Sequence, residues 1–358
     1  MKTIAIVFIA ILIVSCKPET TGDVVSYHRN NSSSGLLSNI DHIHWIPLET
    51  NETMIGETTW LIPAAGSFIV VDVDNARILR YSPDGCFLNI IGDKGNGPGE
   101  YLSIDSVQPL GDTLAVFSMP NATIHRYLPD GSYLGCETVM QEGFQYACVK
   151  DGVLSYSGYG TPSPYRLVLT DEDGKVHQYL KHSSEVISFM DNAPVFTFNQ
   201  DTVLLREPFG KTIYKFHDKE LTPEITFDLG KYGLGDEFFD LDFEQSGEYL
   251  MTKNYGLISN YLQNGSWRFV EVFFPQEQHY DYGLSNGDGW SWFTFSDRDK
   301  NPFVHSFKHL QGGVLYCLVN PFYFKNTDAA ILEKADNPEQ VSGITEDDNY
   351  VIAEIHLK

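Results

Sequence analysis

The chain has 358 residues, of which 42% are hydrophobic and 13% aromatic, a composition typical of a folded protein. Its 48 acidic and 24 basic side chains give a formal net charge of −24. A field of this sign repels phosphate backbones and anionic lipid headgroups, so we expect no nucleic-acid partner and attribute the acidity to solubility.

The first residues have the layout of a secretory signal. A basic start precedes an uninterrupted apolar run over residues 4–14, and the small residue Ser15 stands before Cys16. The run is too short for a transmembrane helix, which needs about 20 apolar residues. Its ending resembles the lipobox of bacterial lipoproteins, in which the cysteine receives a diacylglycerol. We therefore predict a signal peptide over residues 1–15 and lipidation at Cys16, with an ordinary secretory signal as the alternative.

Residues 16–35 are polar and rich in turn-forming residues, which indicates a flexible tether between the lipid and the folded domain. The membrane is then a partner only through the lipid anchor. Glu19 and Asp23 are similar to the acidic surface-export signals of some Gram-negative gut bacteria. We expect a cell-envelope protein of the outer membrane, either periplasmic or surface-exposed.

Four further cysteines, Cys86, Cys136, Cys148 and Cys317, form no Cys-x-x-Cys pair and have no histidines at zinc-like spacing. The sequence therefore argues against a metal site held by sulfur. Each lies beside apolar residues of a predicted strand, where a thiol behaves as a small hydrophobe. We expect free, buried thiols.

An internal repeat organises the chain after the tether. Residues 77–88 align without a gap with residues 123–134, and fainter copies begin at Tyr165 and Thr212. Each copy is a β-rich run, a turn such as Pro-Asp-Gly, and a second β-rich run. Proline presets the first turn position and glycine takes the positive φ that closes a hairpin. With the β-rich runs upstream, one unit is a four-stranded meander.

Units of four short antiparallel strands at this period fit a β-propeller. The sequence therefore predicts an all-β, six-bladed β-propeller over residues 36–358, with seven blades as the alternative. One chain end should complete a blade begun by the other, through residues 43–48 and 350–357. The predicted strand clusters lie near residues 60–92, 104–140, 144–182, 193–229, 247–274 and 290–324.

Residues 90–101, which follow the hairpin at 78–85, and the early segment 46–49 resemble the six-bladed β-propeller lipoproteins of Gram-negative gut bacteria. These are relatives of NHL-type and TolB-like propellers. The resemblance covers essentially the whole mature chain and is sharp over residues 43–135. It implies a propeller in the cell envelope and supplies no agreed catalytic residues.

Two sets of residues are candidates for ligand binding near the repeats. The glycine-rich stretch 95–101 lacks the ending of a phosphate loop, so we interpret it as a connection between blades, with Glu100 and Tyr101 as its useful side chains. Arg80 and Arg126 recur at equivalent places, as does Lys215. They either form a basic rim near the channel or pair with carboxylates on neighbouring strands.

The most aromatic loop region spans residues 281–293 and contains Trp290 and Trp292. Aromatic faces beside amides and carboxylates suit sugar or peptide recognition, and core packing is the alternative.

Residues 297–301 begin like a calcium loop, but Pro302 stands where a glycine is required. Aspartates in residues 72–75 are interpreted as turn caps. The sequence thus predicts no metal and no cofactor.

Neither Gly-x-Ser-x-Gly nor His-Glu-x-x-His occurs, and histidines such as His44, His125 and His305 are scattered. The sequence favours a non-enzymatic propeller that recognises a glycan, a peptide or a partner envelope protein. The alternative is a hydrolase or lyase acting on an extracellular sugar, lactone or peptide. That alternative predicts several Asp, Glu or His side chains at one end of the channel. An assembly scaffold of the envelope is a third hypothesis.

Overall fold

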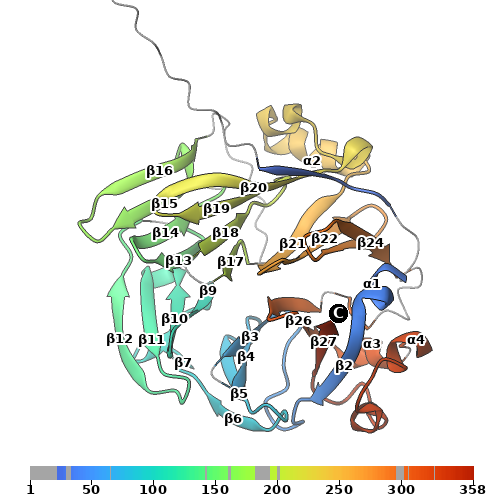
Figure 1. Cartoon of the computed structure of the whole chain (residues 1–358). Helices are drawn as coiled ribbons and strands as arrows, with labels where there is room; N and C mark the ends of the chain where they lie inside the picture. Colours follow the sequence, from blue (N-terminus) through green and yellow to red (C-terminus); the bar gives the residue numbers. More distant parts are fainter. Residues whose placement is uncertain are drawn as a thin grey trace, which may run out of the picture.

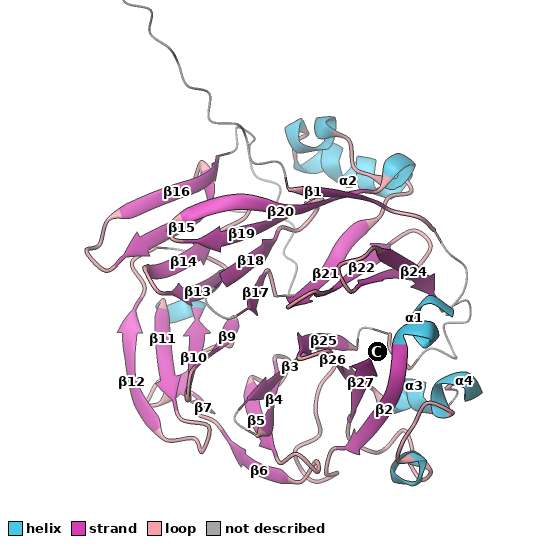
Figure 2. Ribbon diagram, viewed as in Figure 1, coloured by secondary structure: helices cyan, strands magenta, loops and turns pink. Residues whose placement is uncertain are grey.

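Each repeat folds as a four-stranded antiparallel meander, because short turns return the chain beside the strand it has just left. In the computed structural model six such sheets stand as blades around a central channel (Figures 1 and 2). The prediction of an all-β, six-bladed β-propeller is confirmed, and the seven-bladed alternative is not. The structure describes residues 22–29, 34–64, 66–141, 143–159, 163–181, 194–199, 202–295, 302–304, 306–325 and 327–358.

The strands of the blades follow in chain order from the channel outward. Blade 1 contains β3 (Thr59–Ala64), β4 (Ser67–Asp72), β5 (Arg77–Tyr81) and β6 (Phe87–Ile90). Blade 2 contains β9 (Ser106–Leu110), β10 (Thr113–Ser118), β11 (Thr123–Tyr127) and β12 (Tyr133–Thr138). Blade 3 contains β13 (Gln145–Val149), β14 (Gly152–Tyr156), β15 (Tyr165–Asp171) and β16 (Val176–Lys181).

Blades 4 and 5 have the same order, and in blade 6 the outer strand comes from the start of the domain. Blade 4 contains β17 (Phe196–Asn199), β18 (Thr202–Arg206), β19 (Thr212–His217) and β20 (Glu220–Asp228). Blade 5 contains β21 (Leu257–Asn264), β22 (Trp267–Phe274), β23 (His279–Ser285) and β24 (Trp290–Thr294). Blade 6 contains β25 (Phe307–Gln311), β26 (Val314–Val319), β27 (Val351–Leu357) and β2 (Ile40–Pro47).

The ring closes as predicted, with the two ends of the chain in one blade. Strand β2 pairs antiparallel with β27, from Ile40 opposite Leu357 to Pro47 opposite Val351. The pairing buries Trp45, whose ring packs edge-on against Phe324 at a centroid distance of 5.0 Å. Blade 6 therefore cannot unfold without separating β2, near the start of the domain, from the last strand β27.

The predicted strand clusters were wrong around blade 5. Residues 247–252 belong to helix α2 (Phe243–Thr252), and the blade itself begins only at Leu257. A capping box starts this helix, because Asp242 accepts a hydrogen bond from the backbone N–H of Gln245 while the Gln245 side chain accepts one from the backbone of Asp242.

Short helical turns and a small ladder connect the blades. The helices are α1 (Ser34–Asn39), α3 (Pro321–Phe324) and α4 (Ala329–Leu332), and the 3-10 turns are Met119–Asn121, Gly230–Tyr232, Asp236–Asp240 and Pro338–Val341. Strands β7 (Asp93–Lys94) and β8 (Glu100–Tyr101) form a two-stranded parallel ladder between blades 1 and 2. No helix in the described ranges is long and apolar enough to cross a bilayer.

The first described residues are attached to the propeller. Strand β1 (Asp23–Ser26) lies parallel to β20 as a fifth strand of blade 4. Just beyond it, Tyr27 donates a hydrogen bond to Asp281 of blade 5, and Arg29 pairs with Glu277 at 2.8 Å. This part of the predicted flexible tether is thus fixed to blades 4 and 5. The predicted signal peptide and Cys16 lie outside the described residues.

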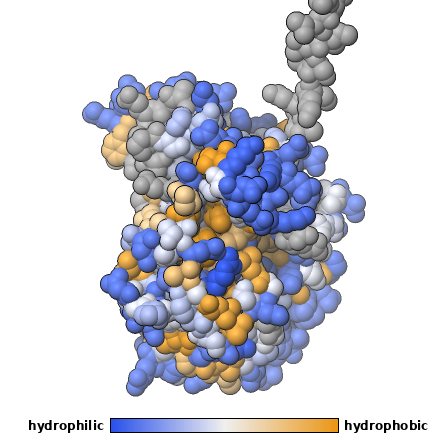
Figure 3. Space-filling model, turned by 90° about the vertical axis from the view of Figure 1, so that its left-hand side faces the viewer, coloured by the Kyte–Doolittle hydropathy of each residue, from blue (hydrophilic) through white to orange (hydrophobic). Residues whose placement is uncertain are grey.

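All four described cysteines are free, as predicted, but only some are buried. Cys317 is buried and Cys148 half-buried, whereas Cys86 and Cys136 are exposed. The expectation of burial was wrong for these two because they lie on the outer hairpin of a blade, where few neighbours cover the chain. Figure 3 shows this side of the molecule, around β12 and β16, with apolar side chains among hydrophilic ones.

Three glycines close equivalent hairpins in successive blades and allow a graded test of the repeat. Gly85, Gly131 and Gly174 have φ of 86°, 91° and 75°. A Cβ atom would lie 2.1 Å from the carbonyl oxygen of Pro47 at the first position and 3.0 Å from that of Ile90 at the second. At the third it would meet nothing within 4 Å.

We expect Gly174→Ala to lower the free energy of unfolding by about 1–2 kcal/mol, the cost of positive φ alone. Gly131→Ala should cost more, and Gly85→Ala should cost most because it also collides with the ring-closing strand β2. Chemical denaturation of the three variants measures this order. Equal losses would contradict the close approach of Gly85 to Pro47.

Candidate functional site

The channel-side strands enclose a cavity of about 800 Å³ that extends across all six blades. Its walls are largely apolar and aromatic, with Trp60, Phe196, Phe198, Phe273, Tyr280 and Phe307 among them. The volume lies in the range of small-molecule sites, which combine apolar walls with a few placed polar groups. We therefore take the cavity as the candidate functional site.

Polar side chains on the first strands of the blades bind the backbone of the next blade. Gln108 of β9 donates to the carbonyl of Cys148 on β13 at 2.8 Å and accepts from its N–H at 2.7 Å. Gln145 of β13 accepts from the N–H of Val195, just before β17, at 2.8 Å. These bonds satisfy backbone groups at strand edges that no further strand covers.

The same pattern continues around the ring. Thr197 of β17 donates to the carbonyl of Tyr261 on β21 at 3.0 Å. Asn260 of β21 donates to the carbonyl of Phe307 on β25 at 2.8 Å. From blade 2 to blade 6, each channel strand is thus fixed to the next by side chains that lie at the cavity wall.

Two adjoining channel strands each carry a β-bulge at the cavity. On β21 the pairing register shifts between Ile258 and Asn260, which leaves Ser259 as the extra residue. On β25 it shifts between Phe307 and His309, which leaves Lys308 as the extra residue. Bulges redirect side chains and are common beside functional sites. Here both extra residues line the cavity.

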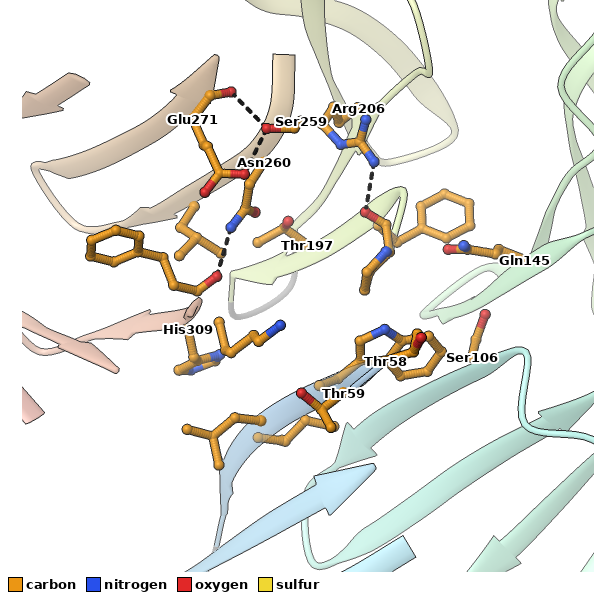
Figure 4. Close-up of a pocket in the computed structure, with 18 of the residues that line it drawn as sticks. Thr58, Thr59, Ser106, Gln145, Thr197, Arg206, Ser259, Asn260, Glu271 and His309 are labelled. Carbon is orange, nitrogen blue, oxygen red and sulfur yellow. Dashed lines mark hydrogen bonds between the residues drawn. The ribbon is translucent and has the colours of Figure 1, made fainter. Parts of the chain in front are cut away.

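The carbonyl that precedes each extra residue is held by a side chain from a neighbouring blade. Arg206, buried on β18 of blade 4, donates through Nη1 to the carbonyl of Ile258 at 3.1 Å. Asn260 holds the carbonyl of Phe307 in the same way (Figure 4). The two bulges are therefore fixed by hydrogen bonds from outside their own sheets, which preorganises the residues that follow them.

Ser259 and Glu271 form a polar pair at the cavity wall. The Ser259 hydroxyl donates to Oε1 of Glu271 at 2.7 Å (Figure 4). Glu271 is only 5% exposed. This bond directs the carboxylate towards β21.

Lys308 faces the cavity beside this pair. Within the described part of the chain, no hydrogen bond or ion pair to its ammonium group is found, and Glu271 acts on it at longer range. Burial lowers the pKa of Lys308 to about 8, and the Glu271 charge opposes that shift. Burial likewise lowers the pKa of the neighbouring His309 to about 4. At neutral pH the cavity thus contains a protonated lysine beside a neutral imidazole.

The sequence-predicted residues of the glycine-rich loop have structural contacts. Glu100 turns back into its own loop and accepts a hydrogen bond from the N–H of Gly97 at 2.7 Å. Tyr101 is fully buried and donates to the carbonyl of Ile91 at 3.2 Å. Neither residue lines the channel cavity.

Of the two interpretations of Arg80, Arg126 and Lys215, the basic rim near the channel does not fit their strand positions. Arg80, Arg126 and Lys215 lie on β5, β11 and β19, the third strands of their blades, and not on the channel strands. Arg126 pairs with Glu137 of the adjacent strand at 2.6 Å, as the alternative interpretation expected. Arg80 instead donates to the hydroxyl of Ser67 at 3.1 Å.

The predicted aromatic site lies on β24, the outer strand of blade 5. Trp290 and Trp292 stack at a centroid distance of 5.9 Å, and both pack edge-on against Phe227 of blade 4. Trp292 is buried in the core between these blades. The contacts agree with the packing alternative and place both rings away from the cavity.

The metal-like motifs give no site in the described part of the chain. Asp72 accepts from the backbone N–H of Asn75 at 3.2 Å and pairs with Arg77 at 2.7 Å, which confirms that it caps a turn. The calcium-like residues 297–301 and His305 lie outside the described residues. Over the ranges that the structure describes, no group of three or more His, Cys, Asp or Glu side chains could hold a metal ion.

The cavity residues not predicted from the sequence are Lys308, Ser259, Asn260, Glu271 and Arg206. One signal could have found some of them. The adjacent polar pairs Ser259-Asn260 and Lys308-His309 interrupt the alternation of otherwise apolar strands, which is what a bulge produces.

The chain belongs to the family described as Domain of unknown function (DUF4934), whose model matches residues 22–356. No curated protein matches the sequence. A crystal structure of a Bacteroides fragilis protein, described as exported, is similar with a TM-score of 0.77 and 18% identity, over 94% of this chain and 100% of that chain. A DUF4221 family member from Bacteroides vulgatus has a TM-score of 0.56 and 10% identity, over 89% and 97%. At these identities the likeness concerns the fold alone.

Replacing Lys308 by Met removes a buried charge and keeps an unbranched side chain. The pKa of this lysine is about 8 in the folded chain and about 10.4 in the unfolded chain. Between these pH values the unfolded chain therefore binds more protons than the folded chain. Burial of the charge therefore destabilises the fold below pH 8, and this loss disappears as the pH rises to about 10.4.

We expect Lys308→Met to raise the free energy of unfolding at pH 7 by about 1–3 kcal/mol, and to have little effect near pH 10.4. Urea denaturation at both pH values measures the difference. Lys150→Met, at an exposed position, is the control and should change little. A loss of stability at pH 7 in Lys308→Met alone would contradict the description of Lys308 as an uncompensated charge.

Proposed function

We propose that this protein is a lipid-anchored binding propeller of the cell envelope, and that its channel cavity holds the ligand. The observation that carries the proposal is the pair of braced bulges, which present Ser259 and Lys308 to an apolar cavity. Natural sheets carry such irregularities where a side chain must be aimed at a ligand. A cavity of this size accepts a small molecule, or one residue that projects from a glycan, a peptide or a partner envelope protein.

The composition of the cavity supports binding more than hydrolysis. Its described acidic and imidazole groups are Glu57, Glu271 and His309. Glu57 is exposed at the edge of β3, and Glu271 is held by Ser259. A hydrolase or lyase would require several such groups to converge on one substrate atom, as general acid, base or nucleophile. The aromatic walls instead offer contact area to a bound apolar group.

The location in the envelope is supported by the predicted signal and lipobox, and by the fold relative from B. fragilis that is described as exported. A lipid on Cys16 would be separated from β1 by very few residues. Because an extended chain spans at most about 3.6 Å per residue, the lipid would hold blade 4 within roughly 25 Å of the bilayer. This is a much shorter link than a tether of residues 16–35.

Filling the cavity tests the proposed site. Leu257 is half-buried at the start of β21 and lines the cavity, so Leu257→Trp should occupy part of the space. We expect the neutral apolar dye N-phenyl-1-naphthylamine to bind the chain without residues 1–16, and Leu257→Trp to weaken binding at least about tenfold. Leu134→Trp, on the exposed strand β12, is the matched control. Equal affinity in all three proteins would exclude the cavity as the site.

Cys16→Ala tests the anchor. In a Gram-negative host, the wild-type chain should fractionate with membranes and carry a diacylglycerol on its first residue. The alanine variant should lose both, because the thioether cannot form. Cys86→Ala, which removes an exposed thiol of the folded domain, should behave as wild type. An unmodified mature N-terminus in the wild-type chain would contradict the lipoprotein proposal.

A further inference from the structure

Among the described residues, the charge of Lys308 has no hydrogen-bonded or ion-paired partner. Lys308 lines the cavity from the bulge of β25, and Glu271, the carboxylate whose charge acts on it, accepts a hydrogen bond from the hydroxyl of Ser259. The other strong cation of the lining, Arg206, directs its guanidinium to the carbonyls of Ile258 and Pro194. Among the described residues of the lining, Lys308 is therefore the cation that is placed to meet a ligand.

We propose that the cavity is selective for a ligand that joins a ring-sized apolar body to one anionic group, and that Lys308 binds the anion. The inference rests on the proposed function, since it names the class of ligand that the cavity accepts. A carboxylate is the simplest biological group of this kind. It would form a charge-assisted hydrogen bond with the ammonium group beside the largely apolar walls of the cavity.

Three features support an anionic ligand over a neutral one. A half-buried ammonium group costs free energy unless an opposite charge compensates it, and the chain nevertheless places one at the wall of a largely apolar cavity. The bulge that directs it is braced by Asn260, so the position is built and not incidental. The net charge of −24 repels anions from the outer surface, which leaves the channel as the place where an anion can gain a compensating contact.

The apolar body of the ligand follows from the aromatic residues of the cavity wall. Trp60 of β3, Phe196 of β17 and Phe273 of β22 line the same cavity. In Figure 4 the labelled polar groups stand around an open centre, with His309 on one side and Gln145 and Ser106 on the other. A neutral imidazole at His309 can donate or accept one further hydrogen bond without adding charge.

Two dyes with a common aromatic frame separate the anion from the apolar body. 1-Anilinonaphthalene-8-sulfonate is monoanionic, and N-phenyl-1-naphthylamine is its neutral counterpart. In the chain that lacks residues 1–16, we expect Lys308→Met to weaken binding of the anionic dye about tenfold or more. Binding of the neutral dye should weaken less than about twofold. Lys308→Arg, which keeps the charge, should retain binding of the anionic dye within about threefold, and the exposed Lys150→Met should change neither.

The pH dependence gives a second readout that a purely structural role would not produce. Among the described residues, the charged or titratable groups that share the cavity with Lys308 or act on its charge include Glu57, Glu271, Arg206, Tyr280, His309 and Cys317. Burial keeps the pKa of His309 near 4 and raises that of Cys317 well above its ordinary value, so neither changes charge from about pH 6.5 to 9. Wild-type affinity for the anionic dye should therefore fall as the pH rises through about 8, and Lys308→Met should be insensitive.

The outcomes separate this inference from the proposed function. Suppose that Leu257→Trp weakens binding of both dyes, and that Lys308→Met weakens binding of both dyes equally or of neither. The cavity then binds ligands, but the assignment of the anion to Lys308 is overturned. If Leu257→Trp affects neither dye, the proposed site and the inference both fail. If the anionic dye weakens selectively in Lys308→Met and its pH dependence disappears, the inference is supported. Denaturation curves of each variant confirm that folded protein is being compared.

Discussion

The first strand of each blade has one edge that no other strand covers, and the backbone groups on that edge must be satisfied by something else. A buried N–H or C=O without a partner costs about as much as a lost hydrogen bond, so six open edges around one channel are a severe constraint. The protein meets it with side chains. Gln108, Gln145, Thr197 and Asn260 each reach from one channel strand to the backbone at the start of the next blade.

This solution links the stability of the ring to the construction of the site. Where Asn260 and Arg206 hold carbonyls of β25 and β21, each strand can bulge without leaving those carbonyls unpaired. The bulges turn Lys308 and Ser259 into the cavity. Lys308 then carries a charge that destabilises the fold at neutral pH, a trade that is common where a residue serves binding more than folding.

Much of the fold could be predicted from the sequence because its turns are local. A Pro-Asp-Gly turn closes a hairpin whatever surrounds it, so the repeats predicted the four-stranded units. The segments 43–48 and 350–357, near the two ends of the chain, predicted how the ring closes. Strand β1 was missed because four residues beside a polar segment carry no periodicity of their own; they become a strand only by pairing with β20. Helix α2 was missed because it is a single short insertion between two blades.

The site could not be predicted for a geometric reason. The residues that the repeat makes conspicuous, such as Arg80 and Arg126, lie on the third strand of a blade and its hairpin. The cavity is lined by first strands, and each contributes only a few residues that have no sequence neighbour in common. Lys308 and Glu271 line the same cavity because β25 and β22 belong to adjacent blades, which spacing along the chain does not reveal.

A crystal structure of the chain in complex with 1-anilinonaphthalene-8-sulfonate would test the central claim most directly. The predicted result is density for the dye within the channel, with a sulfonate oxygen at hydrogen-bond distance from Nζ of Lys308 and the rings against the aromatic wall. Density for the dye only on the outer strands, with the channel empty, would contradict the claim that the cavity is the binding site.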